Sequence, residues 1–370
     1  MPRVLIAGGG PAAVEGLLAV RRLLPEAEVE LTAPDDEFVY RPLAVSEPFG
    51  RHLPDRFSLS RIAEAAGAGC RREAMTAVYA DGKQAVLASG ERLPFDALLV
   101  AIGARPVEAL PGSITFWGRD GDPAFRRALD AAERRSARLT FAVPHRVRWS
   151  LPLYELAMLT ADHLRSRGIT AGLSLVTPEA EPLAVFSGDA SAELERMLIA
   201  RGIELRVSTD PLEYCAGLTG DGDLSVGPEI VVSLPRLLGR GLPDLPVDDQ
   251  QFLSTDEYGR VLGAPGVYAA GDVTDSPIKQ GGLGAQQADS AASAIGFDLG
   301  GHPQLEAFRP TLRARVLTNG ESRFMRRDLD RAGASLVSEA PLWWPGAKVF
   351  GKHLAPFLAA LASLEGARSR

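Results

Sequence analysis

The sequence predicts an α/β protein built on parallel sheets, and two observations support this prediction. An apolar run at residues 4–7 meets a glycine cluster, and a helical pattern follows over residues 13–24. A second succession of strand, helix and strand occurs in the middle of the chain, at residues 139–143, 151–167 and 173–177. Such alternation is typical of parallel sheets covered by helices.

The N-terminal glycine cluster has the form of a phosphate-binding turn. Gly8 permits a tight turn, Gly10 lets the backbone approach a pyrophosphate, and the small Ala13 allows close packing of helix and strand. Pro11 and Ala12 open the helix, whose unpaired N–H groups and positive dipole attract phosphate. A dinucleotide site is therefore expected here, and a tight turn without a ligand is the alternative.

The composition of the chain limits which partners, cellular locations and bound metals can be expected. The chain has 370 residues, which suggests two or three domains, and its net charge of −7 argues against nucleic acid as a partner. Its two cysteines, Cys70 and Cys215, lie far apart, so we expect no disulfide scaffold and a cytoplasmic location. The five histidines are scattered and no long apolar run occurs, so neither a metal site nor a membrane-spanning helix is expected.

The next segments supply further candidates for a ligand site. A second strand at residues 29–32 should end near an acid that holds the ribose, but Ala33 stands there and Asp35 is the nearest carboxylate. An aromatic, basic and proline-containing cluster then offers Arg41 to a phosphate or flavin and Pro42 to a ring. A surface loop with one buried phenylalanine is the alternative for this cluster.

Later segments predict a meander and two buried strands. Short strands at 77–79 and 85–87 read as an antiparallel meander that leads into a buried strand at 95–102. A matching strand at 267–272 ends in Gly-Asp, which can present a carboxylate to a ribityl hydroxyl. A small-residue helix at 285–295 follows, and its opening would direct a positive dipole toward the same place.

The order of these segments resembles that of the two-dinucleotide-domain FAD-dependent oxidoreductases, which are similar to the pyridine nucleotide-disulfide reductases. Residues 38–43 and 279–287 narrow the resemblance to the branch of sulfide:quinone oxidoreductases and type II NADH dehydrogenases. The resemblance implies two Rossmann-like domains, the second inserted in the first, and a C-terminal extension. The implied parts are an FAD domain at 1–110 and 240–315, a degenerate NAD(P)-binding-like domain at 111–239, and a hairpin with an amphipathic helix at 316–370.

The resemblance also implies FAD as the cofactor and assigns residues to it. In chain order these are Gly8, Gly10, Pro11, Ala12 and Ala13 at the pyrophosphate, Ala33 after the second strand, Arg41 and Pro42 over the cofactor, Val78 at the adenine, Ala101, Ile102 and Gly103 in the turn near the cofactor, Gly271 and Asp272 at the ribityl–phosphate region, and Lys279 and Gln280 beside the isoalloxazine. Lys279 is the expected catalytic residue, because its charge would stabilise the anionic reduced flavin.

The middle domain departs from the family at its own phosphate-binding turn. Residues 144–150 contain no glycine, and Pro144 and Trp149 would block the approach of a pyrophosphate. Glu179 could serve as the ribose acid, but without a glycine loop it supports NAD(P)H poorly. The basic side chains of this loop allow two interpretations, a phosphate grip or a solvated loop: His145, Arg146 and Arg148.

Cysteine placement separates the chain from sulfide oxidation by the usual route. That chemistry needs paired cysteines, and Trp149 stands where one would be expected. Cys70 is expected in the meander and Cys215 in a middle-domain strand, both as structural thiols. We therefore expect electron transfer through FAD to a quinone-like acceptor without redox cysteines. An NAD(P)H-dependent flavin reductase and a non-catalytic flavin-binding assembly protein are the alternatives.

The C-terminal segment predicts a hairpin and an amphipathic helix. Asn319-Gly320 is a two-residue turn signal between strands at 316–318 and 322–324. The apolar stripe within 346–364 could dock on the flavin face, form a homodimer, or lie peripherally on the inner face of a membrane. Trp343 and Trp344 could wall an acceptor pocket or belong to an interface.

Overall fold

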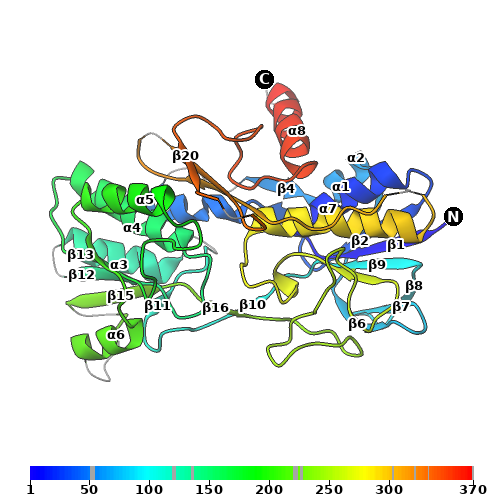
Figure 1. Ribbon diagram of the computed structural model, residues 1–370, viewed down its shortest axis with the longest axis horizontal. Coiled ribbons are helices and arrows are strands. Elements are labelled where there is room, and N and C mark those ends of the chain that lie inside the picture. The colour runs from blue at the N-terminus through cyan, green and yellow to red at the C-terminus, as the bar shows by residue number, and fades with distance from the viewer. Residues whose placement is uncertain are drawn as a thin grey trace.

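The computed structural model has two α/β halves joined by a C-terminal extension (Figure 1). It describes residues 1–50, 55–118, 122–134, 137–219, 224–225, 228–301, 304–320, 322–331 and 333–368, with side chains up to residue 363. The predicted α/β class, with a second Rossmann-like domain inserted in the first, is confirmed. The boundaries given above for these domains stay a prediction.

The first half is organised around a parallel sheet that collects strands from both ends of the chain. Its order is β17–β9–β1–β2–β5, which are Val267–Ala269, Ala97–Val100, Arg3–Ala7, Glu28–Ala33 and Gly69–Arg72. Alternate residues of β1 face opposite sides, so Val4 and Ile6 pack under helices while Leu5 and Ala7 pack on the meander. The covering elements are α1 (Pro11–Leu23), α7 (Gly281–Asp298), β6 (Met75–Tyr79), β7 (Gln84–Leu87) and β8 (Arg92–Pro94).

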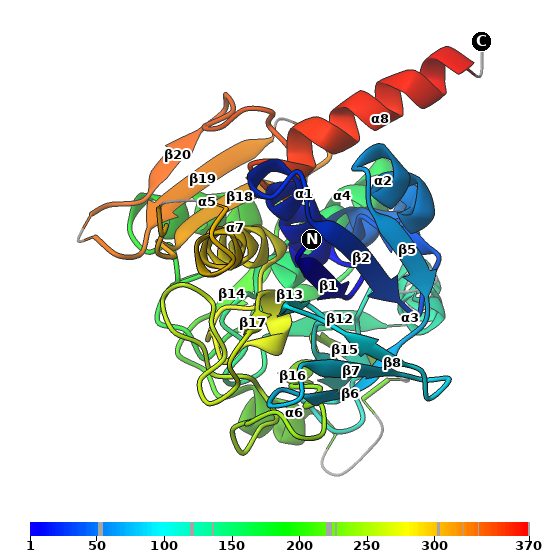
Figure 2. The ribbon, with the colours of Figure 1, turned by 90° about the vertical axis from the view of Figure 1, so that its right-hand side faces the viewer.

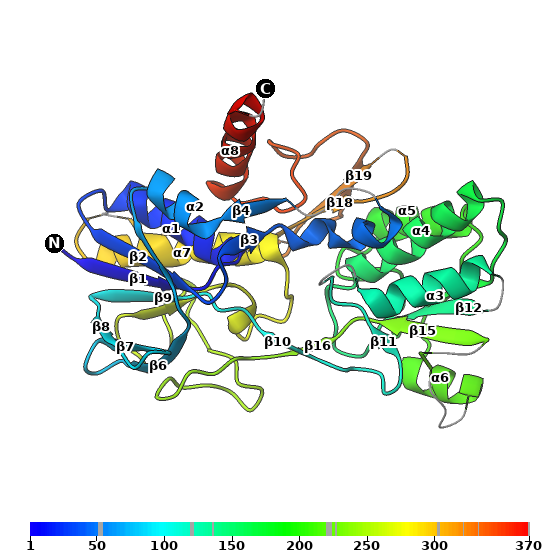
Figure 3. The same ribbon diagram turned by 180° about the vertical axis from the view of Figure 1, so that it is seen from behind.

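Between β2 and β5 the chain reaches across to the other half. Its 3₁₀ segment η1, Arg41–Phe49, extends toward helix α4 of that half (Figure 3). Phe49 packs edge-on against Phe125, with ring centroids 6.1 Å apart. The neighbouring elements are β3 (Glu37–Val39), β4 (Arg56–Ser58) and α2 (Leu59–Ala65).

The second half is built on a parallel sheet, in which the strands predicted at 139–143 and 173–177 lie side by side. Its order is β11–β15–β12–β13–β14, which are Ile114–Thr115, Glu229–Ser233, Arg138–Ala142, Leu173–Val176 and Glu204–Arg206. Its helices are α3 (Pro123–Glu133), α4 (Leu151–Ser166), α5 (Asp189–Ile199) and α6 (Pro211–Thr219). Two antiparallel connecting strands, β10 (Arg105–Val107) and β16 (Arg236–Leu238), run between the halves (Figure 1).

The C-terminal extension contacts both halves. Its antiparallel sheet contains β18 (Thr311–Val316), β19 (Arg323–Asp328) and β20 (Leu336–Ser338). Leu312, Ala314 and Met325 belong to the core of the second half, while Gln286 of α7 bonds to both backbone groups of Thr311. Helix α8, Leu354–Arg368, leaves the first half and projects from the body (Figure 2).

Three local predictions are wrong in detail. Cys70 lies in β5, paired with Leu31 of the main sheet, and not in the meander. Cys215 lies in α6 and not in a strand, buried in a small cluster beneath β15. The predicted hairpin exists, but its ladder ends at Val316 opposite Arg323, because the Leu317 N–H donates to the carboxylate of Glu155. Residue 321 of that connection lies outside the described residues.

Candidate functional site

A large cavity lies between the two halves and the extension. Its volume is about 1320 Å³, more than the roughly 300–1,000 Å³ of an ordinary small-molecule site, so it can hold an extended ligand. The glycine turn, η1, the turn after β9, the loops after β12 and β15, and the tail all contribute to its wall. Eleven predicted cofactor positions line it: Gly8, Gly10, Pro11, Arg41, Pro42, Ala101, Ile102, Gly103, Asp272, Lys279 and Gln280.

The glycine turn has the geometry that a pyrophosphate requires. Gly8 adopts a φ of +129°, and a Cβ added there would lie 2.2 Å from the carbonyl oxygen of Ala101. A Cβ added at Gly10 would meet nothing within 4 Å, so the backbone is open toward the cavity. No side chain caps the N-terminus of α1 at Gly10. Its N–H groups and positive dipole are therefore available to an anion, and these residues fit the diphosphate of FAD.

The other five predicted positions lie beneath the cavity wall and do not line it. A Cβ on Gly271 would be 3.1 Å from Cβ of Ala12, and one on Gly284 would be 3.0 Å from Cα of Gly271. These small residues let the N-termini of α1 and α7 converge below the ligand space. Val78 is fully buried, and its N–H donates to the carbonyl of Pro243 over 3.3 Å. The five are Ala12, Ala13, Ala33, Val78 and Gly271.

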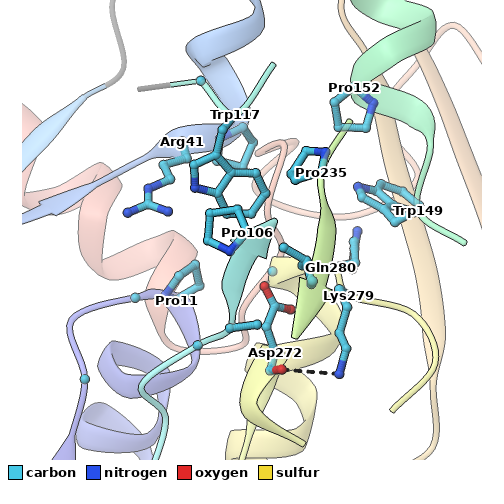
Figure 4. A pocket seen from close by; sticks show the side chains of 18 of the residues that line it. Pro11, Arg41, Pro106, Trp117, Trp149, Pro152, Pro235, Asp272, Lys279 and Gln280 are labelled. Carbon is cyan, nitrogen blue, oxygen red and sulfur yellow. Dashed lines mark hydrogen bonds between the residues drawn. The ribbon is translucent and has the colours of Figure 1, made fainter. Parts of the chain in front are cut away.

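A single ammonium, that of Lys279, lies among carboxylates where α7 begins, and Figure 4 shows it beside Asp272. The Lys279 ammonium donates to the carbonyl oxygens of Asp272, over 3.2 Å, and of Thr274. It also lies 3.6 Å from the centre of the Phe252 ring, and burial lowers its pKa to about 8. Gln280 serves mainly as the N-cap of α7, because its side-chain oxygen accepts from the Leu283 N–H over 2.8 Å. The Lys279 ammonium and the α7 dipole favour negative charge at this end of the cavity, while the carboxylates of Asp248, Asp272 and Asp275 oppose it.

A buried ion pair on the cavity wall was not foreseen from the sequence. Glu155 of α4 is completely buried and pairs with Lys348 of the tail, whose side chain is 8% exposed. Lys348 also donates to the carbonyl of Arg315 over 3.0 Å, and one carboxylate oxygen of Glu155 has no hydrogen-bond partner. Burial raises the pKa of Glu155 and lowers that of Lys348. The sequence signal that could have revealed it is Glu155 itself, the single charged residue within the otherwise largely apolar run 151–161.

Flat side chains form the walls around the space above Lys279. Figure 4 shows Trp117 and Trp149 on either side of Pro235, with Pro106 below. The guanidinium of Arg41 lies 6.0 Å from the centre of a Trp117 ring, and the indole N–H of Trp117 is buried without a partner. These surfaces suit a planar ligand. Trp343 and Trp344 are not among the lining residues: the first donates to the Ala347 carbonyl, and the second is 87% exposed.

The middle-domain turn faces the same cavity without offering a glycine cradle. Arg146, Arg148 and Trp149 line the cavity, whereas His145 bonds to Asp210 over 3.1 Å. Glu179, the candidate ribose acid, does not line it. Its carboxylate accepts four hydrogen bonds within its own domain, from the hydroxyls of Ser150, Tyr154 and Thr177 and from the N–H of Ala184. This carboxylate is therefore structural.

The tail docks on the protein's own first half. The buried Glu15 of α1 accepts hydrogen bonds from the backbone N–H groups of His353 and Leu354. Asp289 of α7 completes a group whose ligand atoms, with those of Glu15 and His353, lie within 4.8 Å of one another. Burial, and then Glu15, raise the pKa of Asp289 to about 8, which favours a proton on this pair of carboxyls. We assign no metal to this group, because Lys352 and Arg22 add positive charge beside it.

Neither cysteine of the chain lines the cavity. Cys70 is exposed on β5, while Cys215 is buried and its pKa is raised to about 11 by burial. That both are structural thiols stays a prediction. Across the described residues, no helix is long and apolar enough to cross a membrane.

Comparison with known proteins shows the fold to be shared. The sulfide:quinone oxidoreductase of Aquifex aeolicus superposes with a TM-score of 0.79 at 17% identity, over 91% of this chain and 87% of that chain. NADH:rubredoxin oxidoreductase of Clostridium acetobutylicum gives a TM-score of 0.58 at 15% identity, over 90% and 83%. An NADH dehydrogenase-like protein of Mycobacterium tuberculosis is 27% identical over 295 residues, 74% of this chain and 73% of that protein. No model of a known protein family matches.

These comparisons confirm the predicted resemblance to the two-dinucleotide-domain oxidoreductases, at the level of their shared fold. The sequence motifs narrowed the resemblance to one branch, that of sulfide:quinone oxidoreductases and type II NADH dehydrogenases, and a sulfide:quinone oxidoreductase is among the structures that share the fold.

Proposed function

We propose that this protein is an FAD-dependent oxidoreductase that delivers electrons to a quinone-like acceptor and takes them from a donor other than NAD(P)H. The observation that carries the proposal is the open glycine turn at Gly8 and Gly10, which enters the same cavity as Lys279 and the Glu155–Lys348 pair. The fold shared with flavoprotein oxidoreductases supports the class.

Bound FAD would supply two-electron redox chemistry. The residues around it have separate tasks. Gly10 and the α1 N-terminus bind the diphosphate, and Arg41 and Pro42 lie over the cofactor. Lys279 and the α7 N-terminus favour the negative charge of the reduced ring system.

The acceptor end is proposed to be the wall beside the tail. Leu151, Pro152 and Val349 give an apolar surface there, next to the ammonium of Lys348. Reduction of a quinone to a hydroquinone takes up two protons with two electrons, and the Glu155–Lys348 pair holds a proton within this wall. A quinone-like ring therefore fits the chemistry of this end. The same route uses no cysteine.

The Lys279 assignment is tested with Lys279→Met. We expect slower reduction of the bound flavin, or a flavin potential shifted downward, because the ammonium near the ring is lost. Lys83→Met is the matched control, since Lys83 is an exposed lysine in the meander that does not line the cavity. If neither the rate nor the potential of Lys279→Met differs from that of the control, the assignment is wrong.

The second candidate function is an NAD(P)H-dependent reductase, favoured by the relatives that are called NADH dehydrogenase-like. The turn without glycine and the engaged carboxylate of Glu179 oppose it. Anaerobic mixing of the FAD-loaded protein with NADH and with NADPH decides between the two. Rapid bleaching of the flavin band by either nucleotide would replace our donor assignment, and an unchanged spectrum supports it.

A non-catalytic assembly protein is the third candidate. It would bind flavin without being reduced by any donor and would retain a partner through residues 341–364. The same residues are our proposed contact for a membrane surface or a second copy of the chain, because α8 projects from the body (Figure 2). Sedimentation with liposomes and light scattering in solution separate these contacts. Failure of both assays would remove this role from the tail.

A further inference from the structure

Four arginines on the wall of the second half are not accounted for by a flavin site. Arg146 and Arg148 belong to the loop after β12, and Arg236 and Arg240 belong to the segment after β15. All four are exposed and line the cavity. Within the described part of the chain, none of their four side chains makes a hydrogen bond, ion pair or ring contact.

The sheet topology brings these arginines together. β12 and β15 are parallel neighbours, with Ala142 beside Ser233, so the segments that follow them leave the same edge of the sheet. The chain passes from β12 to β13 on one side and returns through β15 on the other. Ligands of open α/β sheets bind outside the carboxyl ends of the strands at such a reversal of strand order.

The charged side chains that line the cavity from these two segments are nearly all positive. Between residues 146 and 155 and between 234 and 240, the lining residues include a single acid, Glu155, which the ammonium of Lys348 neutralises. Two other acids of the second half are engaged elsewhere: Asp210 with His145, and Glu179 with hydroxyls of its own domain. The remaining acids of the cavity lining come from other segments, and they are Asp35, Asp36, Glu37, Glu47, Asp248, Asp272 and Asp275. Four arginines therefore face the cavity from these two segments, whose only lining acid is already paired, and such a local excess of positive charge attracts anions.

The loop also excludes a dinucleotide. Pro144 is buried at the start of the turn and Trp149 stands on the cavity wall, where glycines would have to let a pyrophosphate approach. Arg146 has a φ of +65°, a conformation that residues other than glycine seldom adopt and that recurs at ligand-binding sites. The wall can thus hold a charged group by side chains and cannot cradle one with backbone.

We propose that this wall binds the anionic group of the electron donor, a small carboxylate- or phosphate-bearing molecule and not a dinucleotide. Arginine forks pair with carboxylate and phosphate oxygens in two-pronged geometry, and Trp149 provides a flat surface beside them. This inference rests on the proposed function, because it names the class of donor that would serve the same cavity.

The test is calorimetric binding of malonate and of inorganic phosphate to the FAD-loaded protein, with NADH and NADPH as separate titrants. We expect malonate or phosphate to bind, with an affinity that falls as salt is raised. Arg146→Gln/Arg148→Gln and Arg236→Gln should each weaken binding by at least about tenfold, since each removes a charge-assisted contact. Arg105→Gln is the matched control, because Arg105 is exposed on β10 and does not line the cavity.

Each outcome decides the inference. Absence of binding by both small anions, or equal binding by the variants and the control, overturns it. Tight binding of NADH or NADPH that malonate displaces would also overturn it, because the arginines would then serve a nucleotide phosphate. Arg146→Lys/Arg148→Lys should recover part of the affinity, and the flavin spectrum of each variant verifies folding. Failure to retain FAD at all would instead refute the proposed function.

Discussion

Replacing Lys348 by methionine should destabilise the protein in a strongly pH-dependent way. Lys348 is the charge partner of Glu155, which is fully buried between the second half and the tail. Without the ammonium, the carboxylate would be a buried charge facing only one backbone N–H, that of Leu317. Breaking a buried pair by removing one partner is much costlier than replacing both partners.

The loss of unfolding free energy in Lys348→Met cannot exceed the cost of protonating Glu155, because the folded variant can neutralise this carboxylate by taking up a proton. Its ordinary pKa is 4.5, and protonating such a group costs about 1.36 kcal/mol for each pH unit above that value. The loss of unfolding free energy in Lys348→Met therefore reaches at most roughly 3.4 kcal/mol at pH 7 and roughly 1.4 kcal/mol at pH 5.5. The variant should lose stability as the pH rises. Its folded state holds a proton on Glu155 that the unfolded chain has released, so raising the pH favours unfolding.

The assay is urea denaturation of the wild type, Lys348→Met, Lys348→Met/Glu155→Gln and the control Lys352→Met at several pH values. The double variant should be more stable than Lys348→Met at pH 7, because no buried charge remains. Lys352 is exposed on the same tail and has no contact with Glu155, so its replacement should not be rescued by Glu155→Gln. Equal destabilisation of Lys348→Met at pH 5.5 and 7, or no rescue by the second substitution, would refute this reasoning.

Two further predictions concern the tail and the glycine turn. Burial raises the pKa of Asp289 to about 8 from 3.8, so the folded protein keeps a proton there and loses stability as the pH rises toward about 8. In Asp289→Asn the urea midpoint should change less with pH between about pH 6.5 and 8.5, a range above that of His353. If the midpoint of the variant changes with pH as much as that of the wild type, Asp289 does not hold this proton. Gly8→Ala should lower both stability and FAD affinity, since its Cβ would lie 2.2 Å from the Ala101 carbonyl oxygen. Gly10→Ala should weaken FAD binding alone, and full retention of affinity would speak against the pyrophosphate position.

Features written in contiguous residues were predictable from the sequence. The turn from β1 to α1 and the meander depend on local glycine placement and apolar period, so these elements formed where expected. The glycine-free turn after β12 was also predictable. Pro144 and Trp149 restrict how closely a ligand can approach the backbone there, whatever the surrounding structure.

Features that depend on long-range contacts were not predictable. Glu155 meets Lys348 across 193 positions, and Glu15 meets His353 across 338. Glu179 looked like a ribose ligand because its burial among hydroxyls is invisible in a linear pattern. Cys215 was misplaced for a related reason, since the short apolar run around it suits a strand as well as the helix that forms.

The measurement that tests the central claim most directly is the flavin content of the protein after incubation with FAD and removal of free cofactor. The account predicts one FAD retained per chain, with a visible flavin spectrum, because the open backbone at Gly10 and the uncapped α1 N-terminus face the cavity. A protein that is folded, as judged by circular dichroism, yet retains no FAD would contradict it.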